Sequence, residues 1–232
     1  MRRVVVTGAN RGLGLEFTRQ LLARGDRVYA AVRKPGQAHE LTRLALAHPG
    51  RLSVLPFDAT KAATAAELVR EIGLVDDALD TLVNNAGVLP AGERFGSLEA
   101  KTLVETFTAN VVGATLLTQA AAPMLERGVT PRVVNISSNL GSISTRAAFG
   151  TPSYAISKAA LNMATRQLAF ELSARGIIAV AINPGWVRTA MGGPKAELEP
   201  AEAVAAILGV VDRLRSSDSG RFLDGKGDEV PW

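Results

Sequence analysis

The chain has 232 residues, of which 47% are hydrophobic and 21% charged, and its formal net charge is +4 at pH 7. This composition is sufficient for one large buried core, which excludes a mainly disordered chain and leaves little room for two full domains. We therefore expect a single domain over residues 1–232. The basic residues are scattered rather than gathered into a stripe, so we expect no nucleic-acid partner.

The sequence contains no cysteine. Disulfides, thiolate catalysis and cysteine-based zinc sites are therefore excluded, and nothing indicates an oxidising compartment. No apolar stretch approaches the roughly 18 residues that cross a bilayer. These features predict a cytoplasmic protein without a membrane partner.

Short β-branched runs alternate with longer amphipathic stretches along the chain. Strands are expected at residues 4–6, 28–32, 52–55, 81–83, 133–136 and 177–182. Helices are expected at residues 13–23, 37–47, 62–72, 98–125, 154–174 and 200–214. This alternation predicts an α/β fold with a parallel sheet and helices on both faces. Ligands then bind at the carboxyl ends of the strands, where the strand order reverses.

A glycine-rich loop follows the first expected strand and leads into a helix. Glycine lets the backbone turn tightly and approach a pyrophosphate that faces the helix amino terminus. The same pattern also occurs in ordinary strand-helix turns. The loop residues expected to bind a dinucleotide are Gly8, Asn10, Arg11, Gly12, Leu13 and Gly14.

The second expected strand ends before Arg33 and carries no acid at its end. An NAD-type site would place an acid there for the adenosine ribose 2′-hydroxyl. Arg11 and Arg33 instead supply guanidinium groups that suit a 2′-phosphate. The sequence thus favours NADP(H) over NAD(H), unless both arginines are only solvated loop charges.

Two further strand ends offer cofactor contacts. Asp58, with Ala59 beside it, either accepts a hydrogen bond from the adenine amino group or caps the next helix. Asn84, Ala86 and Gly87 follow the fourth expected strand, where small residues let the backbone pass close to the adenosine ribose and pyrophosphate. Taken alone, this second segment is also a common turn.

Tyr154 and Lys158 are four residues apart at the start of an expected helix, so their side chains share one helical face. A free tyrosine has a pKa of about 10, and a nearby ammonium favours the phenolate. We therefore expect Lys158 to lower the pKa of Tyr154 for proton exchange. Such i,i+4 pairs are also frequent on ordinary helix faces.

Ser138 and Asn110 complete the candidate catalytic set. Ser138 follows the fifth expected strand, where its hydroxyl either hydrogen-bonds a substrate oxygen or caps a turn. Asn110 lies among apolar residues in the long helix expected at 98–125, where its amide either holds a water of a proton relay or bridges two helices.

Other chemistries fit less well. A serine hydrolase needs a base, but the only histidines, His39 and His48, are far along the chain from Ser138, and no Gly-x-Ser-x-Gly motif occurs. No cluster of histidine and acidic residues has metal-ligand spacing, so we expect no metal.

Together these motifs resemble the short-chain dehydrogenase/reductase family. The match spans residues 4–189 and keeps the order of the family's motifs. The motifs are Thr7-Gly8-x-x-x-Gly12-x-Gly14, Asn84-Asn85-Ala86-Gly87, Asn110, Ser138, Tyr154-x-x-x-Lys158 and Pro184-Gly185-x-Val187-x-Thr189. The resemblance implies a single-domain Rossmann-type, doubly wound sheet of about seven strands and hydride transfer between a nicotinamide and a carbonyl or alcohol.

The resemblance also implies a role for each residue of the relay formed with Asn110. Ser138 would orient the substrate oxygen, and Tyr154 would donate or remove its proton as general acid or base. Lys158 would lower the pKa of Tyr154 and bind the nicotinamide ribose. The cofactor contacts implied after the sixth strand, which include the backbone at Val187 and the Thr189 hydroxyl holding the carboxamide, are Pro184, Gly185, Val187 and Thr189.

Within the family, segment 183–193 and the ending through Pro231-Trp232 resemble the C-factor and sniffer-type carbonyl reductases. Ala190 stands where that subgroup usually has an acid, and the stretch between Ser138 and Tyr154 is rather short. A short lid is expected within residues 190–200, which favours a small substrate. Side chains that would line its pocket, or else belong to the core, are Val88, Leu89, Trp186 and Met191.

The resemblance suggests a homodimer or homotetramer built through the helices expected at 98–125 and 154–174. The leading hypothesis is an NADP(H)-dependent reductase of a small carbonyl compound (an aldehyde, ketone or quinone), or a catalyst of the reverse alcohol oxidation. The alternative is an NADP-binding regulatory or signalling protein of C-factor type, because a Rossmann domain can bind nucleotide without turnover. A nucleotide-sugar epimerase would normally need a longer carboxyl-terminal domain.

Overall fold

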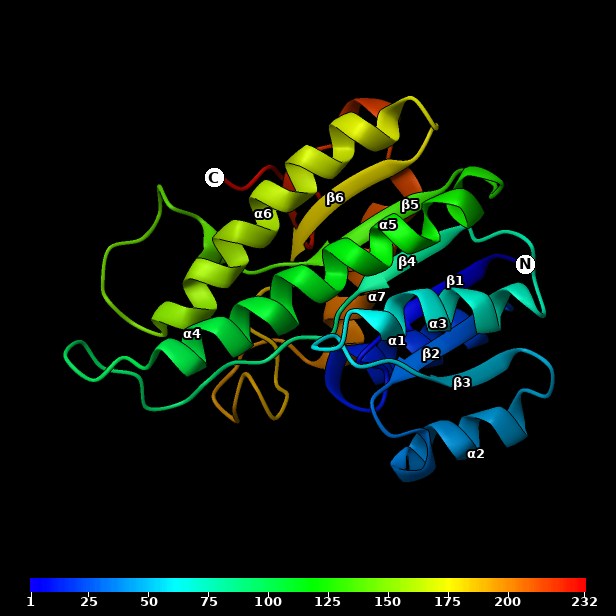
Figure 1. Cartoon of the computed structure of the whole chain (residues 1–232), viewed down its shortest axis with the longest axis horizontal. Helices are drawn as coiled ribbons and strands as arrows, with labels where there is room; N and C mark the ends of the chain where they lie inside the picture. Colours follow the sequence, from blue (N-terminus) through cyan, green and yellow to red (C-terminus); the bar gives the residue numbers. More distant parts are fainter.

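Seven strands form one parallel sheet in the order β3-β2-β1-β4-β5-β6-β7 (Figure 1). The computed structural model describes all residues from Met1 to Trp232. The strands are β1 (Arg3–Thr7), β2 (Arg27–Val32), β3 (Leu52–Pro56), β4 (Thr81–Asn84), β5 (Arg132–Ile136), β6 (Ile178–Asn183) and β7 (Phe222–Asp224). The strand order reverses between β1 and β4, which confirms the predicted doubly wound Rossmann-type sheet.

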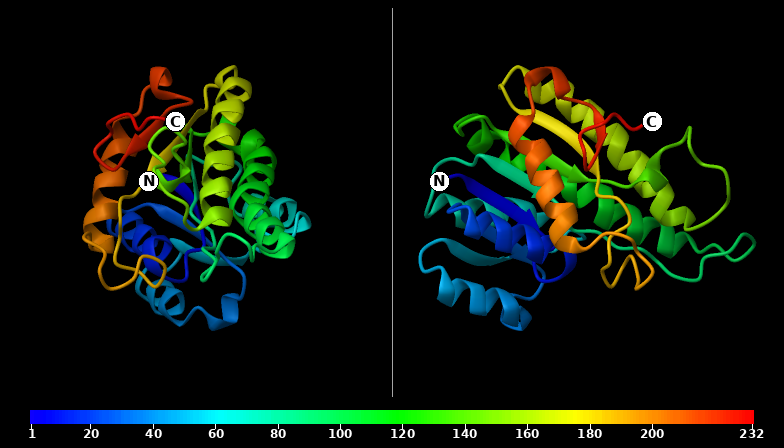
Figure 2. Two further views of the ribbon diagram at one scale, coloured as in Figure 1. Left: turned by 90° about the vertical axis from the view of Figure 1, so that its left-hand side faces the viewer. Right: turned by 180° about the vertical axis from the view of Figure 1, so that it is seen from behind.

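Helices connect the strands and cover both faces of the sheet (Figures 1 and 2). They are α1 (Gly12–Ala23), α2 (His39–Ala47), α3 (Ala63–Gly73), α4 (Ala100–Phe107), α5 (Gly113–Glu126), α6 (Pro152–Ser173) and α7 (Pro200–Arg213). Apolar side chains of α1, α2 and α7 pack on one face, and those of α3, α5 and α6 pack on the other. No helix combines the length and apolar character needed to cross a membrane.

Side-chain alternation in the strands explains why both faces are covered. In β1, Val4 and Val6 join the apolar core beneath α1 and α7, whereas Val5 joins the core beneath α3 and α5. All three are almost fully buried. Strands buried on both faces read as continuous β-branched runs, which is why the sequence located them well.

The helix expected at residues 98–125 contains an irregular turn. Helix α4 passes into a π turn, η2 (Thr108–Val112), before α5 begins. Asn110 lies in this turn, and its side chain bonds to the backbone of Val88 and to Ser157 of α6. A π turn inserts an extra residue into the helix and is frequent at functional sites.

Two other helices start at different residues from those expected. Helix α6 begins at Pro152 rather than at Tyr154, because proline suits the first helical position and Thr151 before it has a left-handed φ of 44°. Helix α2 begins at His39, after a single 3₁₀ turn at Pro35–Gln37. Both differences involve local turn geometry rather than the helical period.

A buried polar network joins β4 and β5 to the helices that cover them. Asn84 Nδ2 donates to Asn135 Oδ1 at 2.8 Å and to Thr118 Oγ1 of α5 at 3.0 Å. Asn135 Nδ2 in turn donates to Thr165 Oγ1 of α6 at 2.8 Å. Unpaired polar groups are costly inside a protein, so this network fixes how the two strands sit against α5 and α6.

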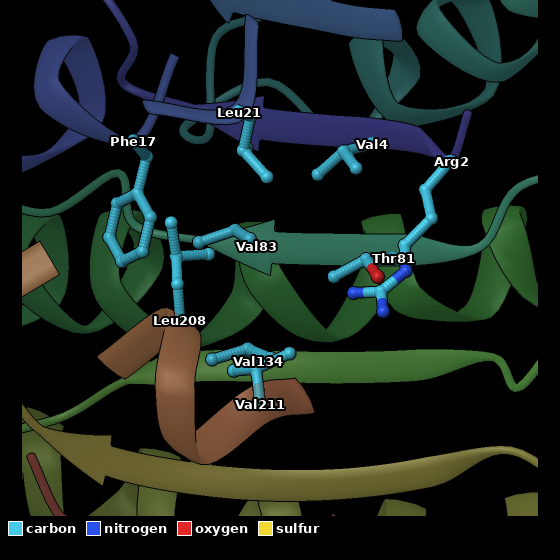
Figure 3. Close-up of a pocket in the computed structure, with 9 residues that line it drawn as sticks. All are labelled: Arg2, Val4, Phe17, Leu21, Thr81, Val83, Val134, Leu208 and Val211. Atoms are coloured by element: carbon cyan, nitrogen blue, oxygen red, sulfur yellow. The ribbon is translucent and has the colours of Figure 1, made fainter. Parts of the chain in front are cut away.

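A small apolar cavity lies between the sheet and helices α1 and α7 (Figure 3). Val4, Phe17, Val83, Leu208 and Val211 are among the side chains that line it. Its volume of about 10 Å³ is near that of a single water probe, so it cannot hold a substrate. The candidate site lies instead at the carboxyl ends of the strands.

Candidate active site

The glycine loop between β1 and α1 closes tightly on itself. Gly8 and Gly12 have φ values of +64° and +53°, in the left-handed region that favours glycine. A Cβ added at Gly14 would lie 2.3 Å from the Gly8 carbonyl oxygen, so no side chain fits there. Helix α1 has neither a side-chain cap nor an acid in its first turn, which leaves its amino end suited to an anion. Asn10 and Arg11 lie in the same loop, and Leu13 lies in the first turn of α1.

Asn85 fastens the loop after β4 to the glycine loop. Its side-chain Nδ2 donates to the Thr7 carbonyl at 2.8 Å, and the backbone N–H groups of Asn85 and Ala86 donate to Thr7 Oγ1 at 2.9 Å. Sequence reasoning singled out Asn84 instead, but the Asn84 side chain lies in the buried network under α5. Any cofactor contact predicted for Asn84 is therefore left to its backbone. Consecutive residues of a strand point to opposite faces, so Asn84 and Asn85 should have different partners, and this alternation could have distinguished them.

The expected adenosine end gathers Arg33 and Asp58. Burial acts to raise the pKa of Asp58, but hydrogen bonds from the Thr60 hydroxyl and N–H, and the nearby charges of Arg33 and Lys61, lower it overall. Asp58 Oδ1 accepts both Thr60 hydrogen bonds, at 2.7 and 3.1 Å, in the turn before α3. Asp58 is therefore ionised, and its second carboxylate oxygen, Oδ2, does not take part in the Thr60 bonds. Asp58 lies beside Arg33, which is exposed at the end of β2.

Two other residues predicted for this end also lie at the strand edge. Arg11 is exposed at the start of α1, and no salt bridge in the chain involves Arg11 or Arg33. Ala59 lies against the start of α5, where a Cβ on Gly113 would come 2.7 Å from the Ala59 Cβ. Both arginines are thus available to an anion from outside the chain.

Ser138, Tyr154 and Lys158 meet where β5 ends and α6 begins. The Lys158 Nζ lies 5.5 Å from the centre of the Tyr154 ring and donates to the Ile136 carbonyl at 2.6 Å. The Ser138 hydroxyl lies near enough to the Tyr154 phenol to act on its pKa. A Cβ on Gly87 would lie 3.9 Å from Nζ, so the loop after β4 passes directly beside the lysine. The structure therefore brings together the three side chains predicted to carry the chemistry.

Burial controls the ionisation of this group. It raises the pKa of Tyr154 to about 12, although the hydrogen bond with Ser138 acts in the opposite direction. Burial also lowers the pKa of Lys158 to about 8. The expected lowering of the Tyr154 pKa by Lys158 is not found in this structure, because burial outweighs other effects on both groups. Tyr154 is consequently a protonated phenol at neutral pH.

Asn110 uses its whole side chain to bridge three segments. Its Oδ1 accepts from Val88 N at 2.7 Å, and its Nδ2 donates to Val88 O and to Ser157 Oγ, both at 2.9 Å. Of the two roles considered for this amide, the structure shows the bridging one, with the bridge running from the π turn to the loop after β4 and to α6. A role of Asn110 in a proton relay remains a prediction. Because the side chain is already bonded, the backbone of Asn110 would have to hold the relay water.

The loop after β6 faces the glycine loop. A Cβ on Gly12 would lie 3.5 Å from Thr189 Cγ2, so Thr189 adjoins the expected pyrophosphate site. Gly185 follows Pro184 with a left-handed φ of +80°, and the turn it permits leads the chain to Val187. Backbone hydrogen bonds of 2.8 Å from Arg188 N to Leu198 O and 3.1 Å from Leu198 N to Trp186 O close the segment into a compact loop. The residues predicted to hold the nicotinamide thus lie together in one compact loop beside the glycine loop.

Apolar side chains from three loops are exposed around this strand edge. Val88, Trp186 and Met191, which we expected in a pocket or in the core, are 38%, 52% and 44% exposed and therefore do not belong to the core. Leu89 beside Val88 is partly buried.

Sequence reasoning missed two aromatic residues at this edge, Phe95 and Phe149. Their rings meet edge to face at 5.8 Å between centroids, although both side chains are largely exposed. Glu93, in the same loop as Phe95, accepts from the N–H of Ser153 at 3.3 Å and from its hydroxyl, and so joins this loop to the first turn of α6. Phe95 and Phe149 lie in irregular loops, where the sequence has no periodicity that would identify them.

Comparisons with known proteins agree with this geometry. A family model described as short chain dehydrogenase matches residues 2–200. The C-signal protein of Myxococcus xanthus is 41% identical over 154 residues, which cover 66% of this chain and 93% of that protein.

Two solved structures share the whole fold. A carbonyl reductase from chicken fatty liver with NADPH bound is 37% identical, with a TM-score of 0.94 over 100% of this chain and 99% of that chain. The carbonyl reductase Sniffer of D. melanogaster is 31% identical, with a TM-score of 0.94 over 100% of both chains. The chain therefore belongs to the short-chain dehydrogenase family and is an oxidoreductase of C-factor and sniffer type.

Proposed function

We propose that this oxidoreductase is an NADP(H)-dependent reductase of small apolar carbonyl compounds, with Tyr154 as the proton donor. The observation that carries the proposal is the meeting of Ser138, Tyr154 and Lys158 at the same strand edge as the adjoining Gly12 and Thr189 loops. The NADPH-bound carbonyl reductase from chicken, similar over the whole chain, supports the same substrate chemistry.

The residues present suit a dinucleotide with a 2′-phosphate. The uncapped amino end of α1 and the glycine loop would hold the pyrophosphate, and Arg11 and Arg33 would hold the 2′-phosphate. Lys158 and Thr189 would contact the nicotinamide half. When bound, the reduced cofactor supplies the hydride that reduces the carbonyl carbon.

The chain's own side chains would handle the substrate oxygen and its proton. The Ser138 hydroxyl donates a hydrogen bond to the carbonyl oxygen and so orients it toward Tyr154. Tyr154, protonated at neutral pH because its pKa is about 12, donates its proton as negative charge develops on that oxygen. The Ser138 and Tyr154 hydroxyls would thus provide two donors for the developing alkoxide.

The apolar rim indicates the substrate class. Side chains from the loops after β4, β5 and β6 expose apolar surface where a substrate would enter, and the edge-to-face ring pair is one part of it. Removing such surface from water favours binding of an apolar or aromatic carbonyl compound. The segment at residues 190–200 would serve as the short lid over it.

A regulatory protein that binds NADP(H) without turnover is the second candidate function. Its supporting observation is the 41% identity to the C-signal protein. The complete catalytic set favours turnover, since nucleotide binding alone would not require Ser138, Tyr154 and Lys158 to lie together. The cytoplasmic location stays a prediction under either function.

The first prediction concerns Tyr154 itself. Tyr154→Phe removes the proton donor but keeps the ring, so kcat for carbonyl reduction should fall about 10²- to 10⁴-fold. Absorbance at 340 nm measures turnover, and NADPH fluorescence measures cofactor binding, which should not change. Tyr29→Phe, at the only other tyrosine, is the control because Tyr29 lies in β2 and bonds to Asp76. Turnover within a few-fold of the wild type in Tyr154→Phe would refute the assignment.

Cofactor preference provides the second prediction. Arg33→Ala removes a charge-assisted contact worth about 1.5–3 kcal/mol, so KM for NADPH should rise roughly 10- to 100-fold while KM for NADH changes little. Arg43→Ala, at an exposed arginine of α2, should leave both values unchanged. Equal changes with NADPH and NADH in Arg33→Ala would show that Arg33 does not read the 2′-phosphate.

The third prediction follows from the lowered pKa of Lys158. In the folded chain this pKa is about 8, below its ordinary value of 10.5, so the unfolded chain binds more protons between these two pH values. The lysine therefore destabilises the fold at neutral pH, and the penalty disappears as pH rises from 8 to 10.5. Lys158→Met should be about 1–3 kcal/mol more stable than the wild type at pH 7, with a smaller difference at pH 10, while losing turnover.

Urea unfolding at both pH values measures this effect. Lys101→Met, at a lysine whose side chain is 79% exposed, is the matched control and should show no pH-dependent difference from the wild type. A stability difference between Lys158→Met and the wild type that is the same at pH 7 and pH 10 would contradict the burial penalty.

We also propose that α6 and α4 form the interface of a homo-oligomer. Ile156, Met163 and Phe170 recur at intervals of seven residues along α6, and all three are more than half exposed, as is Val104 of α4. Two turns of helix separate successive members, so they form one exposed apolar stripe. A twofold axis would let this stripe bury itself against its copy.

Met163→Glu tests this interface, because it places a charge in the middle of the stripe. Sedimentation velocity should show a shift from oligomer to monomer in Met163→Glu and no shift in Leu46→Glu, at an exposed leucine of α2. An unchanged oligomer in Met163→Glu would place the interface elsewhere.

A further inference from the structure

The last residues of the sequence lie across the loop that follows Ser138. Ser142 Oγ donates to the Pro231 carbonyl at 2.6 Å. The Trp232 backbone oxygen accepts from the Ser144 N–H at 2.8 Å and from the Ser144 hydroxyl at 2.5 Å. Three hydrogen bonds thus join positions almost ninety residues apart in the sequence, and we call residues 230–232 the clasp.

The clasp is anchored on the sheet by the Trp232 ring. This ring stacks on Phe222 of β7, with 5.7 Å between centroids and 27° between planes. Phe222 is fully buried, so it offers a fixed surface. The Val230 N–H also donates to the Phe222 carbonyl at 2.8 Å. The position of the clasp is therefore set by β7, independently of the loop it holds.

The segment held by the clasp begins at Ser138. Ser138 opens a 3₁₀ turn, η3 (Asn139–Gly141), by accepting from Leu140 N at its hydroxyl, at 3.2 Å. Its carbonyl accepts from the Gly141 N–H at 2.9 Å, and Ser142 follows with its side chain buried. Only one short turn separates the two residues, so we expect a displacement of Ser142 to displace the Ser138 hydroxyl as well.

Helix α6 supports the opposite side of the same turn. A Cβ on Gly141 would lie 2.7 Å from the backbone of Lys158, and Asn162 Nδ2 donates to the Gly141 carbonyl at 3.3 Å. Turn η3 therefore lies between α6, which carries Tyr154 and Lys158, and the clasp. Without the clasp, only the α6 side of the turn would remain supported.

We propose that Trp232 is a positioning residue for carbonyl reduction, because its ring anchors the clasp that holds η3 and so sets Ser138 against Tyr154. This inference rests on the proposed function of the site. The glycine loop and Arg33, which would hold the cofactor phosphates, lie at the ends of β1 and β2 on the other side of the strand-order reversal. Loss of the clasp should therefore affect the substrate step and spare cofactor binding.

Trp232→Ala tests the proposal with two measurements on the full chain. Small misplacements in an active site cost up to roughly 100-fold in rate, and we expect kcat to fall about tenfold with KM for NADPH within twofold of the wild type. Hydrogen exchange followed by mass spectrometry should show faster exchange in a peptide covering residues 139–146, which includes the bonded N–H groups of Gly141, Ser142 and Ser144. A peptide from the glycine loop should exchange at the wild-type rate.

Two further variants separate positioning from general stability. Trp232→Phe keeps an aromatic ring for stacking and should recover most of kcat and of the exchange protection. Ser142→Ala removes one clasp hydrogen bond and should change kcat and exchange in the same direction as Trp232→Ala, by a smaller factor. Ser173→Ala, which loses a serine hydrogen bond at the far end of α6, and Leu74→Ala, at an exposed residue after α3, should leave both unchanged.

Wild-type exchange over residues 139–146 in Trp232→Ala would overturn the proposal. So would equal losses in kcat and NADPH affinity, because they would indicate general loosening of the fold. If the wild-type chain reduces no carbonyl compound with NADPH, the proposed function fails, and the exchange measurement alone then supports or overturns the clasp.

Discussion

Burial of the Lys158 amine without an acidic partner is the constraint on which the rest of the site depends. Its Nζ has one hydrogen-bond acceptor, the Ile136 carbonyl at the end of β5, and only burial shifts its pKa. A buried amine in this position is costly for folding. The segments around Lys158 must therefore be held in place by other interactions. These segments also have glycine at the positions that contact Lys158, because a larger side chain there would push the lysine aside. Gly141 packs on its backbone, and Gly87 passes beside its Nζ.

Long-range contacts hold those segments. Asn110 bonds the π turn to Val88 and to α6, and Glu93 accepts hydrogen bonds from Ser153 at the start of that helix. Thr151, with its left-handed φ, turns the chain into α6 just before Tyr154. Strained or irregular backbone next to a buried charge lowers stability locally, and such conformations persist where surrounding contacts determine them. The polar bridges between loops and helices provide those contacts here.

The features with a regular period could be predicted from the sequence, and those fixed by distant contacts could not. Alternation and β-branched runs located the strands from β1 to β6, and the parallel sheet then brought Ser138, Tyr154 and the glycine loop to one edge. The π turn, the role of Asn85 and the Phe95–Phe149 pair depend on partners 20 to 90 residues away, for which local pattern carries no signal. The ionisation of Tyr154 was also missed, because spacing places a lysine beside it but does not show how deeply both groups are buried.

The two shifted pKa values bear on the direction of the proposed reaction. Reduction of a carbonyl needs a proton donor, whereas oxidation of an alcohol needs a base at the same position. With a pKa of about 12, Tyr154 is protonated throughout the neutral range and is ready to act as the donor. To act as the base, Tyr154 would first have to lose its proton. The positive charge of Lys158 would stabilise the resulting phenolate, but Lys158 has a pKa of about 8 and loses this charge as the pH rises above 8. The charge that stabilises a phenolate therefore declines over the pH range in which the phenolate would form, which agrees with the proposed use of Tyr154 as a proton donor.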